Sequence, residues 1–229
     1  MNLIALSDLH GSLIKVKEPF DLMLIAGDVC PVYCHRREFQ AEWLKDEFVE
    51  WVMSLPFKDE GSKVVMVAGN HDFVLESWTQ KKIDEWVSLF NDRLIYLNNT
   101  EYVFKCNEKE YKIFGTPYCK VFGNWAFMRE DLDYYYKHIP QGLDFLISHD
   151  AADINGLGMI AEGHHAGTNA GNKVLAKYLL ESKPKYYFCG HIHSGNHELT
   201  DIGNGTKAAN VAILDERYNI SNFGLKLVI

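Results

Sequence analysis

Five short apolar runs in this chain each end in residues that can bind a metal ion or move a proton. The endings are Ser7-Asp8-Leu9-His10-Gly11, Gly27-Asp28, Gly69-Asn70-His71-Asp72, Ser148-His149-Asp150 and Gly190-His191-Ile192-His193. Half of the ten histidines fall in these five segments. A single Asp in such a place is typical of a helix N-cap, and a single His of a turn. Five such endings in one chain instead favour one shared site.

The mixture of side chains in these segments indicates the chemistry of that site. Carboxylate, imidazole and amide groups together suit Mn, Fe, Zn, Ni or Co better than an all-thiolate structural site does. Seven such groups exceed the needs of one catalytic metal ion, whereas two ions about 3.5–4 Å apart would use them, with one carboxylate bridging. The adjacent glycines allow tight turns and leave room for a substrate.

The apolar runs themselves predict the elements that bring these residues together. Because they lack strict alternation, they are typical of strands buried on both faces; they are Asn2–Leu6, Asp21–Ala26, Lys63–Ala68, Leu143–Ile147 and Lys185–Cys189. Apolar residues at three- and four-residue steps predict helices over 38–55, 77–90 and 171–182. We also expect hairpins pairing 102–106 with 110–114 and 198–200 with 207–214, and a last strand over 223–229.

Strands that alternate with helices predict an α/β fold with a largely parallel central sheet. In such a sheet the carboxyl ends of the strands lie together, and ligands bind there. The chain has no internal repeat and no linker that would divide it, so we expect residues 1–229 to form a single domain.

The ordered motifs resemble those of the calcineurin-like metallophosphoesterases. The motifs that match are Asp8-Leu9-His10, Gly27-Asp28, Gly69-Asn70-His71-Asp72, His149 and Gly190-His191-Ile192-His193. All five occur in the family's order, between residues 8 and 193. The resemblance implies a four-layer αββα sandwich, in which two packed mixed sheets are flanked by helices.

The resemblance also implies a role for each matched residue. One metal ion would be held by Asp8, His10, Asp28 and His193, and a second by Asp28, Asn70, His149 and His191, with Asp28 bridging. His71 would bind the substrate and protonate the leaving group, with Asp72 as its orienting carboxylate, and Asn70 would also contact the substrate. A hydroxide bridging the two ions, most simply Mn²⁺, would attack phosphorus in line.

A narrower resemblance concerns the small branch that contains class III-type cyclic-nucleotide and other phosphodiesterases. It rests on Gly115-Thr116-Pro117-Tyr118, on Asn124-Trp125-Ala126-Phe127 and on the tail from Asn210 to Tyr218. The segment Ser148-His149-Asp150-Ala151-Ala152 departs from the branch, whose members commonly have Gly and prolines after the His.

Several other polar residues have both a functional and a plain structural explanation. His164 and His165 lie in a Gly-rich loop where they would either contact the substrate or face solvent. Asn124 and Trp125 would line the pocket, or the aromatic Trp125 would pack in a lid. Asp150 would orient His149 or cap a turn. Cys34 beside His35 lacks a second pair at zinc-site spacing, so the five cysteines are better explained as reduced thiols.

Composition and charge limit the classes of partner that the protein could bind. The formal charge of −8 and pI near 5.7 argue against a tightly held nucleic-acid polymer, because such binding depends on Lys and Arg. No run approaches the ~18–20 apolar residues of a membrane span, nor the core of a signal peptide. We therefore expect a soluble, cytoplasmic protein with a small phosphate-ester substrate. The sequence specifies no oligomeric state.

These observations predict a dinuclear metal-dependent phosphoesterase that hydrolyses a small phosphodiester, such as a nucleotide. The branch resemblance alone favours a diester over a monoester. The alternatives are a phosphomonoesterase acting on proteins or small molecules, and a metal-bound scaffold for protein interactions. The complete set of seven ligands and His71 argues against the scaffold.

Overall fold

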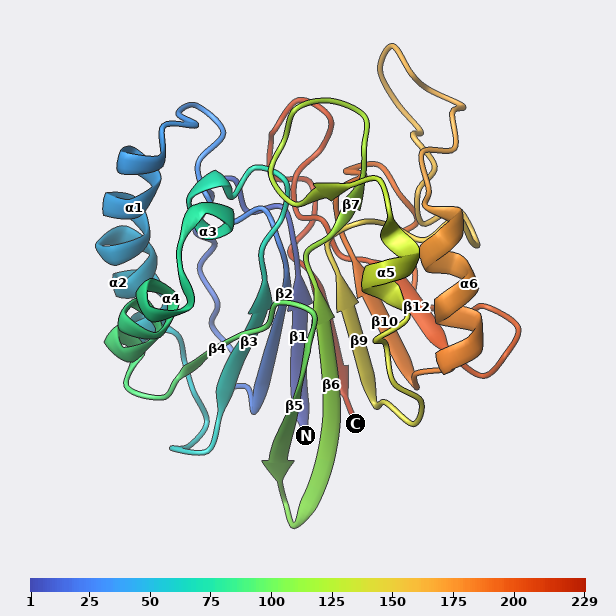
Figure 1. Ribbon diagram of the computed structural model, residues 1–229. Coiled ribbons are helices and arrows are strands. Elements are labelled where there is room, and N and C mark those ends of the chain that lie inside the picture. The colour runs from blue at the N-terminus through green and yellow to red at the C-terminus, as the bar shows by residue number, and fades with distance from the viewer.

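Two mixed β-sheets face each other at the centre of the computed structural model, which describes residues 1–229 (Figure 1). The first sheet has the order β13 (Leu225–Val228), β1 (Asn2–Leu6), β2 (Leu22–Ala26), β3 (Lys63–Val67) and β4 (Leu94–Tyr96). The second has the order β11 (Thr200–Asp201), β12 (Lys207–Asn210), β10 (Tyr186–Cys189), β9 (Phe145–Ser148), β6 (Lys109–Thr116) and β5 (Thr100–Cys106). Both sheets are parallel except at their edges, where β13, β11 and β5 pair antiparallel to their neighbours.

Helices cover the outer face of each sheet (Figure 1). The first sheet carries α1 (Arg37–Lys45), α2 (Glu47–Ser54), α3 (Phe73–Ser77) and α4 (Gln80–Val87), the last followed by a 3₁₀ turn at Ser88–Phe90. The second carries α5 (Leu132–Tyr136) and α6 (Lys173–Ser182). A short parallel pair, β7 (Cys119–Lys120) and β8 (Met128–Arg129), lies outside the two sheets. The expected four-layer αββα sandwich is confirmed.

The apolar strands explain these layers, because alternate side chains of a strand point to opposite faces. In β1, Leu3 and Ala5 pack in the core between the two sheets, while Ile4 and Leu6 pack against the helices of the first sheet. All five residues of β2 are buried. The expectation of strands buried on both faces is therefore confirmed for the strands that carry the chemistry.

The single helix expected over 38–55 is wrong, since Asp46 separates α1 from α2 with φ −102° and ψ −80°. Residues Trp43 and Phe48 would lie about 140° apart around an unbroken helix. The break brings both into one core, where the Phe48 ring centroid lies 5.7 Å from that of Trp43 and 6.2 Å from that of Trp86. Shared burial of these aromatic rings outweighs helix continuity.

The helix expected over 77–90 is also shorter than predicted. Trp78 has extended ψ of 139° and ends α3, and the Thr79 hydroxyl accepts a hydrogen bond from the Lys82 amide to begin α4. The left-handed Asn91, with φ 49°, follows the closing 3₁₀ turn. The third expected helix is confirmed as α6, which begins after an Asn172 N-cap.

Both expected hairpins form. Asn107 and Glu108 have φ of 50° and 62° between β5 and β6, which is the conformation of a two-residue hairpin turn. The strand expected over 207–214 ends at Asn210, because the chain then crosses to the first sheet. There the Ser7 amide donates to Val211, and the Ile213 amide donates back to Ser7. The elements α3, β4, β7, β8 and α5 were not predicted.

The topology places the carboxyl ends of β1, β2, β3, β9 and β10 at the same edge of the two sheets, the upper edge in Figure 1. The loops that carry the polar segments therefore meet above the core between the sheets. None of the helices is both long and apolar enough to cross a bilayer.

Candidate metal centre and active site

The loops at this edge are held in conformations that side-chain-bearing residues seldom adopt. Asp8, His10, Asp28 and His191 have φ of 56°, 43°, 51° and 67°. Left-handed backbone of this kind costs roughly 1–3 kcal/mol per residue and persists where the surroundings enforce it, often at functional sites. Backbone hydrogen bonds enforce it here, since the Asp8 amide donates to Gly27 and the His10 amide donates to Asp28.

Two buried carboxylates form the centre of the cluster. Asp28 Oδ2 lies 3.3 Å from His149 Nε2 and 3.5 Å from His10 Nε2, while its Oδ1 accepts a hydrogen bond from the His71 amide. Asp8 Oδ1 lies 3.4 Å from His193 Nε2. Asp28 therefore contacts groups from several strand ends, as a bridging ligand would.

Backbone carbonyls orient two of the imidazoles. His149 Nδ1 donates to the Ala26 carbonyl at 2.9 Å, and His193 Nδ1 donates to the Asp215 carbonyl at 2.9 Å. Each bond leaves Nε2 directed at a carboxylate. Metal-binding histidines are commonly held in this way, with one ring nitrogen bonded to the protein and the other free for the metal.

The protein's own charges are paired within the cluster. Burial raises the pKa of Asp8, but the hydrogen bond and charge of His193 lower it further, to about 2. Burial lowers the pKa of His149 and His193, yet the neighbouring carboxylates raise these pKa values to about 10 and about 9. A divalent cation bound here would displace these protons, as metal binding to histidine generally does.

His10 shows that the cluster fits a metal ion. Both of its ring nitrogens are buried and have no hydrogen-bond partner, which is costly unless a ligand satisfies them. Three sets of ligand atoms lie within 4.8 Å of one another: Asp8, His10 and His193; His10, Asp28 and His71; and Asp8, Asp28 and His149. These are nitrogen and carboxylate donors of the kind that transition-metal ions accept.

Asn70 and His191 complete the group of predicted ligands. Asn70 Oδ1 lies 2.9 Å from His149 Nε2, and the ring centroids of His191 and His149 are 5.1 Å apart. Glycines allow this close approach: a Cβ at Gly69 would overlap Asp28 Oδ1, and one at Gly190 would overlap Asp8 Oδ2. The structure thus places five predicted ligands in sets of closely spaced ligand atoms, and it places Asn70 and His191 beside His149.

Asp72 makes no hydrogen bond to the His71 ring, so the hydrogen bonds do not support its predicted role as the orienting carboxylate. Its carboxylate instead accepts hydrogen bonds from three backbone amides, of Gly69 at 2.8 Å, Cys30 at 2.8 Å and Val29 at 3.3 Å. Burial and the charge of Asp28 raise its pKa to about 6. Asp72 therefore ties the loop after β3 to the loop after β2.

Replacing Asp72 with alanine should lower the free energy of unfolding by about 2–4 kcal/mol, because three buried amides lose their acceptor. Asp72→Asn keeps one acceptor oxygen and should cost less. Denaturant unfolding of both variants measures the difference. Unchanged stability of Asp72→Ala with reduced turnover would instead restore the role beside His71.

The partner of His71 is His35, which the sequence did not identify as a site residue. His71 Nδ1 lies 3.2 Å from His35 Nε2, and Trp125 packs on the His71 ring with centroids 4.5 Å apart. Buried Gln40 fixes the backbone, donating to the His71 carbonyl at 2.7 Å and accepting from the Val74 amide at 3.0 Å. His71 thus has Nε2 left to meet a substrate. Burial lowers its pKa, and the charge of Asp28 partly opposes that effect.

His35→Ala should lower kcat by about five- to tenfold, the cost of one lost hydrogen bond of ~1–1.5 kcal/mol. The loss should be larger for esters with poor leaving groups, because the bond orients the group that protonates them. Cys34→Ala, one residue away, is the matched control. Equal losses for good and poor leaving groups would show that His35 does not act through His71.

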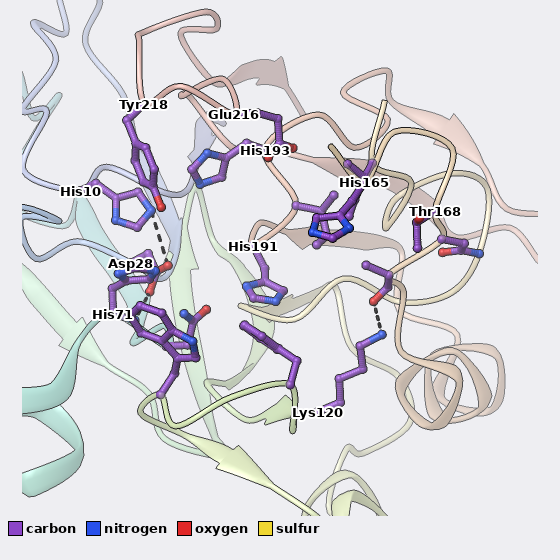
Figure 2. A pocket seen from close by; sticks show the side chains of 17 residues that line it. His10, Asp28, His71, Lys120, His165, Thr168, His191, His193, Glu216 and Tyr218 are labelled. Carbon is purple, nitrogen blue, oxygen red and sulfur yellow. Dashed lines mark hydrogen bonds and ion pairs between the residues drawn. The ribbon is translucent and has the colours of Figure 1, made fainter. Parts of the chain in front are cut away.

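A cavity of about 620 Å³ opens above the cluster (Figure 2). Its lining includes His165, Lys120, Phe122, Trp125, Ile160, Glu216 and Tyr218 in addition to most of the predicted ligands and His71. Among the loop residues predicted to contact the substrate or line the pocket, His165 and Trp125 line the cavity, whereas His164 and Asn124 do not. Lys120, Phe122 and Tyr218 were not predicted as site residues. Tyr218 does end the tail segment that carries the narrower resemblance, but nothing in that segment shows that it would reach the cavity.

Asp150 has a structural role rather than an orienting one. Its Oδ2 accepts from the Lys120 amide at 2.9 Å and from Asn172 Nδ2 at 2.7 Å. It therefore joins β7 to the start of α6. The Lys120 ammonium donates to the carbonyls of Ala170 and Gly171 at the cavity rim (Figure 2).

The two facing sheets and the Asp/His cluster at their shared edge define a metallophosphoesterase-type protein. The model of the calcineurin-like phosphoesterase family matches residues 1–195. The chain therefore belongs to the calcineurin-like phosphoesterase family, whose members depend on metal ions, and the resemblance found in the sequence is confirmed.

Two curated proteins are similar to parts of this chain. The chain is 26% identical over 200 residues to a probable rhamnogalacturonate lyase C of Emericella nidulans, covering 85% of this chain and 17% of that protein. It is 30% identical over 118 residues to UPF0046 protein T07D4.2 of Caenorhabditis elegans, covering 48% of this chain and 27% of that protein. The chain thus corresponds to a minor part of either relative.

Solved structures share the fold. TT1561 of Thermus thermophilus has a TM-score of 0.56 at 10% identity, with 91% of this chain and 88% of that one covered. The phosphopantetheinyl hydrolase PptH of Mycobacterium tuberculosis has a TM-score of 0.54 at 15% identity, with 93% and 89% covered. A putative 5′-nucleotidase of Staphylococcus aureus has a TM-score of 0.51 at 12% identity, with 97% and 52% covered.

Proposed function

We propose that this protein is a metal-dependent phosphoesterase that hydrolyses a small phosphodiester at a centre of two divalent ions. The observation that carries the proposal is the position of His10. This buried imidazole makes no hydrogen bond, and its Nε2 faces the carboxylates of Asp8 and Asp28 at the floor of a substrate-sized cavity. Membership of the calcineurin-like phosphoesterase family supports the reaction class.

The proposed ligands divide into two sets that share Asp28. One set is completed by Asp8, His10 and His193, and the other is completed by Asn70, His149 and His191. Two bound ions, most simply Mn²⁺, would supply positive charge for the phosphate oxygens and would lower the pKa of the attacking water. The contacts of Asp28 with His10 and His149 support its bridging place.

His71 is the proposed proton donor. Its Nδ1 faces His35, so Nε2 would give the proton to the oxygen of the departing alcohol. The packing of Trp125 and the bond to His35 hold the ring in one orientation. A bound phosphate anion would favour the protonated form of the imidazole. Asn70, beside His71 in the same loop, is proposed to contact the substrate as well.

The size of the cavity supports a small substrate. A volume of about 620 Å³ lies within the range of ~300–1,000 Å³ typical of small-molecule sites. Phe122 and Trp125 add apolar walls beside the ligands. These walls suit the second ester group of a diester, such as a nucleoside, and the net charge of −8 does not suit a nucleic-acid polymer.

The test begins with protein stripped by a chelator and reloaded separately with manganese, nickel, zinc or magnesium. Each form is assayed on bis-p-nitrophenyl phosphate and on p-nitrophenyl phosphate. Metal-restored cleavage that favours the diester is the expected result. A preference for the monoester would establish a phosphomonoesterase, and two bound ions without cleavage of either ester would favour the scaffold.

We also propose that residues 1–229 act as a single domain in the cytoplasm. The pairing of β13 with β1 joins the end of the chain to its beginning within one sheet, which supports the single domain. All five cysteines are free, which supports a reducing compartment.

A further inference from the structure

Tyr218 lies over the proposed metal centre, although the sequence assigned it no role in the site. Its ring meets two proposed ligands edge-on, with centroid distances of 5.1 Å to His10 and 5.2 Å to His193. It comes from the loop after β12, far in sequence from the strand ends that supply most ligands. Figure 2 shows the phenol directed from this loop down into the cavity, with its hydroxyl beside His10.

The turn that carries Tyr218 is built to hold it there. Tyr218 has φ 62°, a left-handed conformation that a bulky aromatic residue rarely adopts. Asp215 imposes it: the Asp215 carboxylate accepts from the amides of Arg217 at 2.8 Å and Asn219 at 2.9 Å, and its carbonyl accepts from the Tyr218 amide at 2.9 Å. The same carbonyl accepts from His193 Nδ1. One residue therefore positions both the phenol and a proposed ligand.

The hydroxyl of Tyr218 is free to bind a ligand. The hydroxyl makes no hydrogen bond within the protein. Tyr218 lines the cavity, and its hydroxyl points into it (Figure 2). Two other donors at the cavity wall are already engaged, since Lys120 donates to backbone carbonyls and Asn169 donates to Asp153. A phenol has an ordinary pKa of about 10, so it offers a proton for hydrogen bonding at neutral pH.

We propose that the Tyr218 hydroxyl donates a hydrogen bond to a non-bridging phosphate oxygen of the substrate, which makes Tyr218 a substrate-binding residue of the reaction. The proposal rests on the proposed function of the site and adds to it a contact from the side of the cavity formed by the loop after β12. A fixed donor of this kind is worth most where negative charge gathers on the phosphate oxygens during the reaction.

A purely structural role of the ring is distinguishable from this contact. Tyr218→Phe removes only the hydroxyl and keeps the ring against His10 and His193, so folding and metal content should not change. Tyr33→Phe is the matched control, because Tyr33 is 73% exposed and lies outside the cavity. Each protein is loaded with manganese, and its metal content is measured before any assay.

The experiment measures two quantities on the wild-type protein and both variants. The first is the affinity for inorganic phosphate by calorimetry, and the second is kcat/KM on bis-p-nitrophenyl phosphate. For Tyr218→Phe we expect phosphate affinity to fall about five- to tenfold and kcat/KM to fall ~10–100-fold, between the loss of a neutral hydrogen bond and that of an oxyanion-hole donor. Tyr33→Phe should match the wild type in both.

The proposed contact would be refuted if Tyr218→Phe bound phosphate and hydrolysed the ester as well as the wild-type protein does. It would also be refuted if this variant lost its metal ions together with its affinity for phosphate. Failure of the loaded wild-type protein to bind phosphate would overturn it as well. If the wild-type protein binds phosphate but hydrolyses no ester, the proposed function fails while the phosphate measurement still decides the role of Tyr218.

Discussion

Replacing Asp28 with alanine should remove most of the bound metal and ester hydrolysis together. Asp28 is the carboxylate that approaches both His10 and His149, at 3.5 and 3.3 Å, so its loss would affect both proposed ions. The loss should exceed the ~10–100-fold typical of an outer-shell partner of a metal site. Metal analysis of the purified variant and its kcat/KM on bis-p-nitrophenyl phosphate measure the two effects.

Asp21→Asn is the matched control for this variant. Asp21 is also a buried carboxylate, but it precedes β2 at the opposite end of the strand and pairs with Lys58 at 2.9 Å. Its replacement should change stability without changing metal content. Full metal occupancy in Asp28→Ala would refute the bridging role.

Replacing His71 with alanine should produce a loss that depends on the leaving group. Protonation of the departing oxygen typically contributes ~10²–10⁴ in rate, so esters of simple alcohols should lose about this factor. p-Nitrophenyl esters should lose far less, because nitrophenolate departs without a proton. Rates on a series of esters with leaving groups of graded acidity give the dependence directly.

The exposed His138 provides the control for this substitution, since His138→Ala removes an imidazole that lies outside the cavity. Its rates should match the wild type across the series. Equal losses for good and poor leaving groups in His71→Ala would contradict the role as proton donor and would leave His71 as a binding residue.

The candidate site could be predicted from the sequence because its parts sit at strand ends. A buried parallel strand is recognisable from its apolar run, and the topology of an α/β fold brings the carboxyl ends of such strands together. The positions of Asp8 and Asp28 after β1 and β2 followed from these two rules. The family motifs added which residues would share one ion.

The partners of His71 could not be predicted in the same way. The sequence places Asp72 next to His71, but neighbouring residues in a tight loop point in different directions, and Asp72 turns inward to three amides. His35 reaches His71 from the loop before α1. Tyr218 reaches the site only through the Asp215 turn. Such contacts depend on how distant loops pack, which no local pattern contains.

The prediction of the helix boundaries over residues 38–55 was wrong for a related reason. Nothing in the local sequence marks Asp46 as a helix break, since neither Gly nor Pro is present there. The break follows from the requirement that Trp43 and Phe48 enter the same core. Tertiary packing overrode local helix propensity at this position.

The most direct test of the central claim is a titration of chelator-stripped protein with manganese. The number of ions bound per chain and the hydrolysis of bis-p-nitrophenyl phosphate are measured in the same samples. The proposed centre predicts two bound ions per chain, with hydrolysis appearing as the sites fill and absent from Asp28→Ala. Failure of the wild-type protein to bind manganese, or hydrolysis that does not depend on bound metal, would contradict it.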